Sequence, residues 1–299
     1  MNILYAALAV ALGLGGAIGA NSLLQGGTKP ATALSAQSPA PSKPTGGLGS
    51  YVDYQKALLP VVFPKAPGDG LPPPEYRISG EGCVIALDVR SWAWRADAEA
   101  TMLEAYRKMA VSMGKEDTTA PPASPFPGTA QDGERILTHS YEKFDLRSFD
   151  LEAVTRKDAE GFVIGIVGAA PFTGGNDPTN RAIVDVMVAN APTPDKAEGI
   201  REFGQKGRMK FNLPFGDFAD PQWQQTKGLF EALREAALTD RGITNITMGV
   251  SSSVLQDGTR RTMSGGLKQP RHFPIYASSG DDLDRLLAGL RDHRRRHCE

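Results

Sequence analysis

The first 24 residues are the most apolar stretch of the chain. Apart from Tyr5, every residue from position 3 to position 20 is apolar or glycine, and residues 2–24 carry no charged side chain. A helix needs about 20 mostly apolar residues to span a bilayer. The pattern predicts an N-terminal hydrophobic helix, either kept as a membrane anchor or cleaved as a signal peptide. A buried helix of a soluble fold is disfavoured, because such helices rarely lack polar residues throughout.

The segment after the hydrophobic helix has the composition of a spacer. Residues 26–50 are rich in proline, alanine, serine and glycine and contain few large apolar side chains. Such a segment buries too little apolar surface to offset the entropy of ordering its backbone. The Lys and Arg residues near the hydrophobic helix say little about its orientation in the membrane. We expect the chain after this helix to be exported, because a spacer follows the helix. We predict a membrane anchor or signal at 1–25, a flexible tether at 26–50 and an extracytoplasmic domain at 51–299.

Apolar runs with β-branched residues predict the strands of that domain. Three runs look fully buried, at 82–90, 161–169 and 181–189. Further strand signals lie at 135–144, 208–215, 243–253, 259–267 and 272–277. Asp257 and Gly258 predict the hairpin turn between two of these strands. The sequence pattern does not decide the secondary structure of residues 146–156.

Apolar residues at intervals of three and four predict the helices. One helix reaches from Asp97 to Met113 and carries a stripe of methionines, which favours a core face over an adaptable binding surface,. The cleanest helix follows Asp220 and Pro221, and a final helix follows Ser279. Short helices are expected at 51–59 and 194–204.

The order of these elements predicts the fold class. Several adjacent strands lack a crossover helix between them, which favours an α+β fold over a doubly wound sheet. We therefore expect a single mixed or mainly antiparallel sheet with about three helices packed on it, preceded by the N-terminal hydrophobic helix and a disordered tether.

Two proline-rich segments interrupt this pattern. Pro72, Pro73 and Pro74 favour polyproline II, either as a stiff connector or as a ligand for an aromatic groove, and we prefer the connector,. Residues 115–134 form a long proline-rich loop. Loops of that length inside a domain are often functional or disordered.

Charge and cysteine content exclude several function classes. The chain has 33 Lys and Arg against 34 Asp and Glu, a formal net charge of −1, so no nucleic-acid partner is expected,. No cofactor is expected, because no phosphate-binding or dinucleotide-binding glycine spacing occurs. Two cysteines and four scattered histidines give no zinc spacing, and no metal is expected,. His293 and His297 have helical metal spacing but lie in an arginine-rich end.

The two cysteines link the structure to its compartment. In an oxidising space Cys83 and Cys298 form a disulfide if the fold brings their Cα atoms within about 7 Å. We expect the final helix to return Cys298 towards the start of the first core strand. The alternative is that Cys83 is a small apolar core residue and Cys298 a free terminal thiol.

Three residues are the best catalytic candidates in a chain without a catalytic motif. Asp88 ends an apolar strand, and His139 and Glu142 lie together in another. An ion pair of Asp88 with a neighbouring arginine is the simpler interpretation. His139 and Ser140 point to opposite faces of their strand, so they form no serine–histidine pair.

A basic cluster at Arg291, Arg294, Arg295 and Arg296 has two interpretations. The cluster complements the dipole at the end of the final helix, or it binds an anionic partner such as a phosphate, a lipid headgroup or an acidic protein.

The leading function hypothesis is a non-enzymatic binding or assembly domain of the cell envelope or surface, membrane-anchored through residues 1–24 or secreted, with a protein partner. The alternative is an envelope hydrolase that uses Asp88, His139 and Glu142.

Overall fold

The structure is a computed structural model, and it describes residues 46–62, 70–112, 130–159, 161–217, 220–239 and 242–298. The predicted membrane segment at 1–24 and most of the proline-rich loop at 115–134 lie outside the described residues. Within the described ranges, no helix is both long enough and apolar enough to cross a bilayer.

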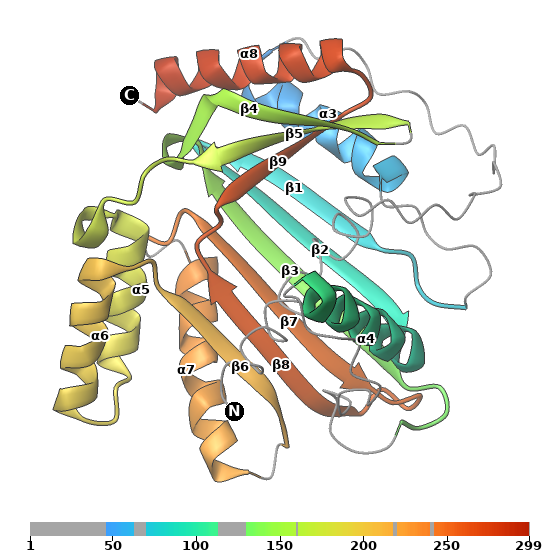
Figure 1. The fold of residues 1–299 in the computed structure, drawn as a ribbon, viewed down its shortest axis with the longest axis vertical. Coiled ribbons are helices and arrows are strands. Elements are labelled where there is room, and N and C mark those ends of the chain that lie inside the picture. The colour runs from blue at the N-terminus through green and yellow to red at the C-terminus, as the bar shows by residue number, and fades with distance from the viewer. Residues whose placement is uncertain are drawn as a thin grey trace.

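Two antiparallel sheets form the centre of the molecule (Figure 1). The larger sheet has six strands, in the order β1 (Glu75–Glu81), β2 (Val84–Trp94), β3 (Arg135–Asp145), β7 (Ile246–Val254), β8 (Arg260–Lys268) and β6 (Lys210–Asp217). The smaller sheet has three strands, in the order β4 (Phe149–Ala159), β5 (Phe162–Ala169) and β9 (His272–Ala277).

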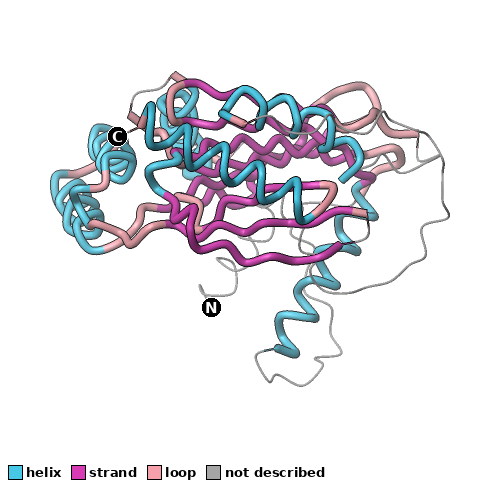
Figure 2. Tube along the Cα trace, turned by 90° about the horizontal axis from the view of Figure 1, so that it is seen from above, coloured by secondary structure: helices cyan, strands magenta, loops and turns pink. Residues whose placement is uncertain are grey.

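Six α-helices surround these sheets in the described part of the chain: α3 (Gly47–Val62), α4 (Arg95–Ser112), α5 (Pro178–Ala189), α6 (Pro194–Lys206), α7 (Pro221–Leu238) and α8 (Gly280–His297). Figure 1 shows α8 lying across the smaller sheet, with α3 beside it, while α5, α6 and α7 gather at the β6 side of the larger sheet. Figure 2 shows that α4 stands away from the two sheets.

The α+β class is confirmed, and two details of the prediction are wrong. The strands form two sheets instead of one, and the described residues hold six helices instead of about three. One extra helix is α5, which occupies the run at 181–189 that we predicted as a strand. The Asp177 side chain accepts a hydrogen bond from the Asn180 backbone N–H at 2.7 Å, and Pro178 follows at the first helical position. These start signals outweigh the β-branched content of the run.

The N-terminal boundary of the domain also moves. Helix α3 begins at Gly47, so the last residues of the predicted tether are helical. Strand β1 was not predicted, because Tyr76 and Ile78 directly after the prolines give only two apolar positions in alternation, which is a weak strand signal,. Strand β4 resolves the ambiguous segment at 146–156.

The first hydrophobic core lies where α3, α8 and both sheets meet. Phe144 of the larger sheet packs against Phe149 and Phe273 of the smaller one, with ring centroids 5.9 Å and 4.8 Å away. Leucines of α8 close this core, and Leu283 fits over Gly165 of β5, where a Cβ atom would lie 2.7 Å from the leucine. Burial of this apolar surface holds the two sheets together.

The second core lies under α7, on the larger sheet. Phe230 and Leu233 of α7 pack with Leu213 and Met248 of the sheet. The Phe230 ring packs directly on Gly265, because a Cβ atom at Gly265 would lie 2.6 Å from the ring.

Replacing Phe230 with alanine should destabilise the protein by about 3–5 kcal/mol, because the ring is 1 % exposed and the change leaves a cavity,. Urea denaturation measures this loss. Leu238→Ala, near the end of the same helix where the side chain is 42 % exposed, is the control and should cost less than about 1 kcal/mol,. Equal losses in the two variants would contradict the placement of this core.

Candidate functional site

Asp88 and His139 form a hydrogen-bonded pair on the larger sheet. Asp88 Oδ1 lies 2.8 Å from His139 Nε2, and the two side chains are 24 % and 17 % exposed. In the register of β2 and β3, Asp88 lies opposite Tyr141 and His139 opposite Arg90. The pair is therefore a diagonal contact between neighbouring strands on one sheet face.

An aromatic and basic surface continues from this pair along the same face. The register places Arg90 opposite His139, and Trp92 opposite Leu137. The Arg135 guanidinium lies 5.2 Å from the centre of the Trp92 ring, a cation–π contact,. Arg90 is exposed, and the other side chains are half-buried. We call the set Asp88, Arg90, Trp92, Arg135, Leu137 and His139 the Trp92 surface.

Glu142 points away from this surface. It is three residues after His139 in β3, and side chains of a strand alternate between faces. The register confirms this, because Glu142 lies opposite Leu87 and Thr247, while His139 lies opposite Arg90 and Val250. The structure thus brings together Asp88 and His139 but leaves Glu142 on the other face, so the three sequence candidates do not form one site.

Glu142 has its own charged neighbours on that second face. It is half-buried, and burial raises the pKa of its carboxyl to about 7, with Lys268 acting in the opposite direction,. Lys268 lies opposite Thr247, two strands from Glu142, and burial lowers the pKa of its ammonium group. Tyr276 of the smaller sheet is buried nearby, which raises the pKa of its hydroxyl.

Ser140 lies on the same face as Glu142, one step along β3. Its side chain is 2 % exposed, and its Oγ has no hydrogen-bond partner among the residues that the structure describes. Buried hydroxyls are normally paired, so this group carries a desolvation cost of about 1–3 kcal/mol. The face of the sheet that carries Glu142 is thus polar, and the hydrogen-bonding capacity of its Ser140 hydroxyl is not used by the described residues.

The chemistry open to the Asp88–His139 pair is limited by its geometry. In a serine–histidine–aspartate triad the acid binds Nδ1 and the Nε2 atom faces the nucleophile. Here the acid itself occupies Nε2. The pair can hold and exchange a proton or anchor a charged partner. In the described ranges, no group of three or more His, Cys, Asp or Glu side chains is arranged to hold a metal ion.

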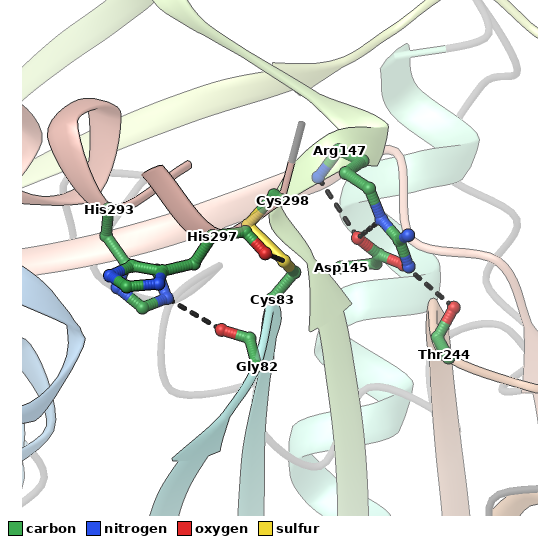
Figure 3. Close-up of a disulfide and its surroundings, with 8 residues drawn as sticks. All are labelled: Gly82, Cys83, Asp145, Arg147, Thr244, His293, His297 and Cys298. Atoms are coloured by element: carbon green, nitrogen blue, oxygen red, sulfur yellow. Dashed lines mark hydrogen bonds and ion pairs between the residues drawn. A yellow bond between two sulfur atoms is a disulfide. The ribbon is translucent and has the colours of Figure 1, made fainter. Parts of the chain in front are cut away.

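A disulfide joins Cys83 to Cys298, which are 215 positions apart in sequence and have Cα atoms 5.6 Å apart (Figure 3). Cys83 lies in the turn between β1 and β2, and Cys298 caps the end of α8. The bond ties the last helix to the first hairpin of the domain.

The histidines near the disulfide serve the same connection. His293 Nε2 lies 2.6 Å from the Gly82 carbonyl oxygen, and the His293 and His297 rings are 4.6 Å apart (Figure 3). His293 therefore uses a ring nitrogen to hold α8 against the hairpin. Beside it, Asp145 accepts hydrogen bonds from Arg147 and Thr244.

The basic cluster of α8 is partly structural. Arg291 donates to the Leu151 carbonyl oxygen at 2.8 Å and pairs with Glu152 at 3.0 Å, and Arg294 donates to the Phe149 carbonyl oxygen at 3.0 Å. Arg295 and Arg296 are 69 % exposed and pair with Asp292. The first two arginines clamp α8 to β4, whereas the second two face solvent.

Searches against protein-family models, curated proteins and solved structures found no match to this chain. The site residues that sequence reasoning missed are Trp92, Arg135, Lys268 and Tyr276. Trp92 and Arg135 stand four residues after Asp88 and four before His139, so the alternation of β2 and β3 places all of them on one face,. Lys268 and Tyr276 carry no such local signal, because they reach Glu142 through strand order and sheet packing.

Glu142→Gln should change how stability depends on pH. The pKa of the Glu142 carboxyl is higher in the folded state than in the unfolded state. The stability that the protonated carboxyl contributes is therefore fully present below its unfolded-state pKa of about 4 and is lost as pH rises through about 7,. The variant should match the wild type near pH 4 and be more stable by about 1–3 kcal/mol at pH 8. Urea denaturation across this pH range measures the difference. Glu81→Gln, at an exposed position, should stay within about 0.5 kcal/mol throughout,.

Cys298→Ser should lower the free energy of unfolding by about 3–5 kcal/mol, because it releases a loop of more than two hundred residues in the unfolded chain,. Denaturation of the variant and the wild type, each with and without reductant, measures this loss. Reductant should bring the wild type down to the variant and leave the variant unchanged. Two free thiols in protein purified from an oxidising compartment would contradict the bond.

Proposed function

We propose that this protein is a membrane-tethered, extracytoplasmic binding domain that docks a protein partner on the Trp92 surface. The observation that carries the proposal is the gathering of Arg90, Trp92, Arg135 and the Asp88–His139 pair on one sheet face. Tryptophan and arginine are the side chains most enriched at protein interfaces and at their energetic hot spots.

The position of this surface in the fold supports binding. Tyr141 and Val250, which share the face, pack against the core under α7. The Trp92 surface lies further along β2 and β3, on rigid strands instead of loops. Side chains held on strands present a fixed pattern to a partner, which reduces the entropy lost on docking.

The extracytoplasmic address rests on two supports. Residues 2–24 have the composition of a membrane or signal helix,. The Cys83–Cys298 disulfide suits an oxidising compartment, since cytosolic disulfides are rare and usually transient,.

Site-specific photo-crosslinking in cells tests the proposal. A photo-crosslinking amino acid in place of Arg90 should capture one discrete protein, and adding Trp92→Ala should reduce that product about tenfold or more, since truncating a hot-spot tryptophan costs 2 kcal/mol or more. The same amino acid in place of Lys157, on the exposed strand β4, is the control. Equal products from both positions, or none from position 90, would sink the proposal.

The second candidate is the envelope hydrolase, favoured by the 2.8 Å contact of Asp88 with His139. This pair would act in proton transfer without Glu142. His139→Ala separates the two functions: loss of activity in a complementation assay with the crosslink from position 90 intact favours the hydrolase, whereas loss of both favours the binding domain.

A further inference from the structure

Three arginines of the basic cluster surround a hollow on the molecular surface. It has a volume of about 280 Å³ and is lined by Glu152, Ala288, Arg291, Arg294 and Arg295. A water molecule takes up about 30 Å³ in the liquid, so the hollow has room for a tetrahedral anion with part of its hydration shell.

The positions of two of these arginines are fixed before any ligand arrives. Arg291 and Arg294 donate to the Leu151 and Phe149 carbonyl oxygens of β4, at 2.8 Å and 3.0 Å. Each guanidinium has five N–H donors, and these backbone contacts leave other donors of Arg291 for a ligand. Anchoring the side chains in this way removes part of the entropy that a flexible arginine loses on binding.

The charge of the hollow selects an anion. Three guanidinium groups and one carboxylate line the hollow, a difference of two positive charges, and Asp292 outside the lining pairs with Arg295 at 3.6 Å. Glu152 repels an anion, but its side chain is 66 % exposed and, among the described residues, pairs with Arg291 alone at 3.0 Å, so it can turn towards solvent. Planar guanidinium groups bind phosphate oxygens in pairs, which makes phosphate the best matched anion.

The hollow lies close to where the chain enters the domain. Gly289 of α8 packs on the backbone of Gly46 and Gly47, since a Cβ atom at Gly289 would lie 2.9 Å from the Gly47 nitrogen. Arg291 is two residues further along α8. The composition of residues 26–45 predicts a flexible tether, and a flexible chain of about 20 residues has an average end-to-end distance of about 25 Å.

We propose that this hollow binds the phosphate group of an anionic membrane lipid and so fixes which end of the domain faces the bilayer. This inference rests on the proposed function, because the tether is what brings α8 to the membrane. Basic clusters near an anionic surface gain affinity with each arginine that approaches it.

Inorganic phosphate tests the anion site on the full chain in neutral detergent. Phosphate should raise the melting temperature above that in chloride of equal ionic strength. Arg295→Gln should weaken the apparent phosphate affinity about fivefold. Glu152→Gln should strengthen it. Arg285→Gln, on the same helix but paired with Asp282 at 3.1 Å outside the hollow, should leave it unchanged.

Vesicles test the lipid source. The full chain is reconstituted in phosphatidylcholine alone or with phosphatidylglycerol, and amide hydrogen exchange of residues 288–297 is compared. Exchange should slow with phosphatidylglycerol to the same extent in the wild type and in Arg285→Gln, and should slow less in Arg295→Gln, because its affinity is about fivefold weaker.

The outcomes distinguish the anion site, its assignment to a lipid and the membrane attachment. Phosphate stabilisation that Arg295→Gln leaves intact, or none at all, overturns the site. A normal phosphate response without any lipid dependence overturns the assignment to membrane lipid. Cell fractionation of the full chain tests membrane attachment alone. A soluble full-length product would contradict membrane attachment in the proposed function, but it would not contradict the binding of inorganic phosphate in the hollow.

Discussion

The smaller sheet must bury its apolar face, and this requirement organises the fold. Phe273 and Gly165 share that face, where Phe273 packs with Phe144 of the larger sheet and Leu283 of α8 covers Gly165. Leu283 reaches β5 only because Gly165 has no side chain. The first core is therefore complete only when α8 has docked. The Cys83–Cys298 bond then joins that last element to the first hairpin.

The two-residue period of β3 separates the polar chemistry of the larger sheet into two environments. His139 belongs to the face that carries the Trp92 surface, where side chains contact each other and solvent. Glu142 and Ser140 belong to the other face, where burial raises the Glu142 carboxyl pKa to about 7 and the Ser140 hydroxyl has no hydrogen-bond partner in the described part of the chain. One strand thus carries the Trp92 surface on one side and the polar side chains of Ser140 and Glu142 on the other.

Sequence patterns predicted the elements better than their arrangement. Caps and periodicity located α7 and α8, and apolar runs located β2 and β5, because these signals are local. The run at 181–189 failed, since its β-branched residues suit either structure and the deciding cap lies four residues upstream at Asp177. The division into two sheets and the meeting of Glu142 with Lys268 depend on strand order, which leaves no trace in any short segment.

The contact of Gly289 with Gly46 and Gly47 also determines how the domain responds to mechanical tension. A pull on the chain at Gly46 would reach α3 first, and α3 lies alongside α8. The load would act as shear between two helices, and the covalent bond at Cys298 would pass it to the hairpin of β1 and β2. Hydrogen bonds between β3, β7 and β8 lie outside this path. The pairing of those strands would therefore persist when the domain is pulled from Gly46.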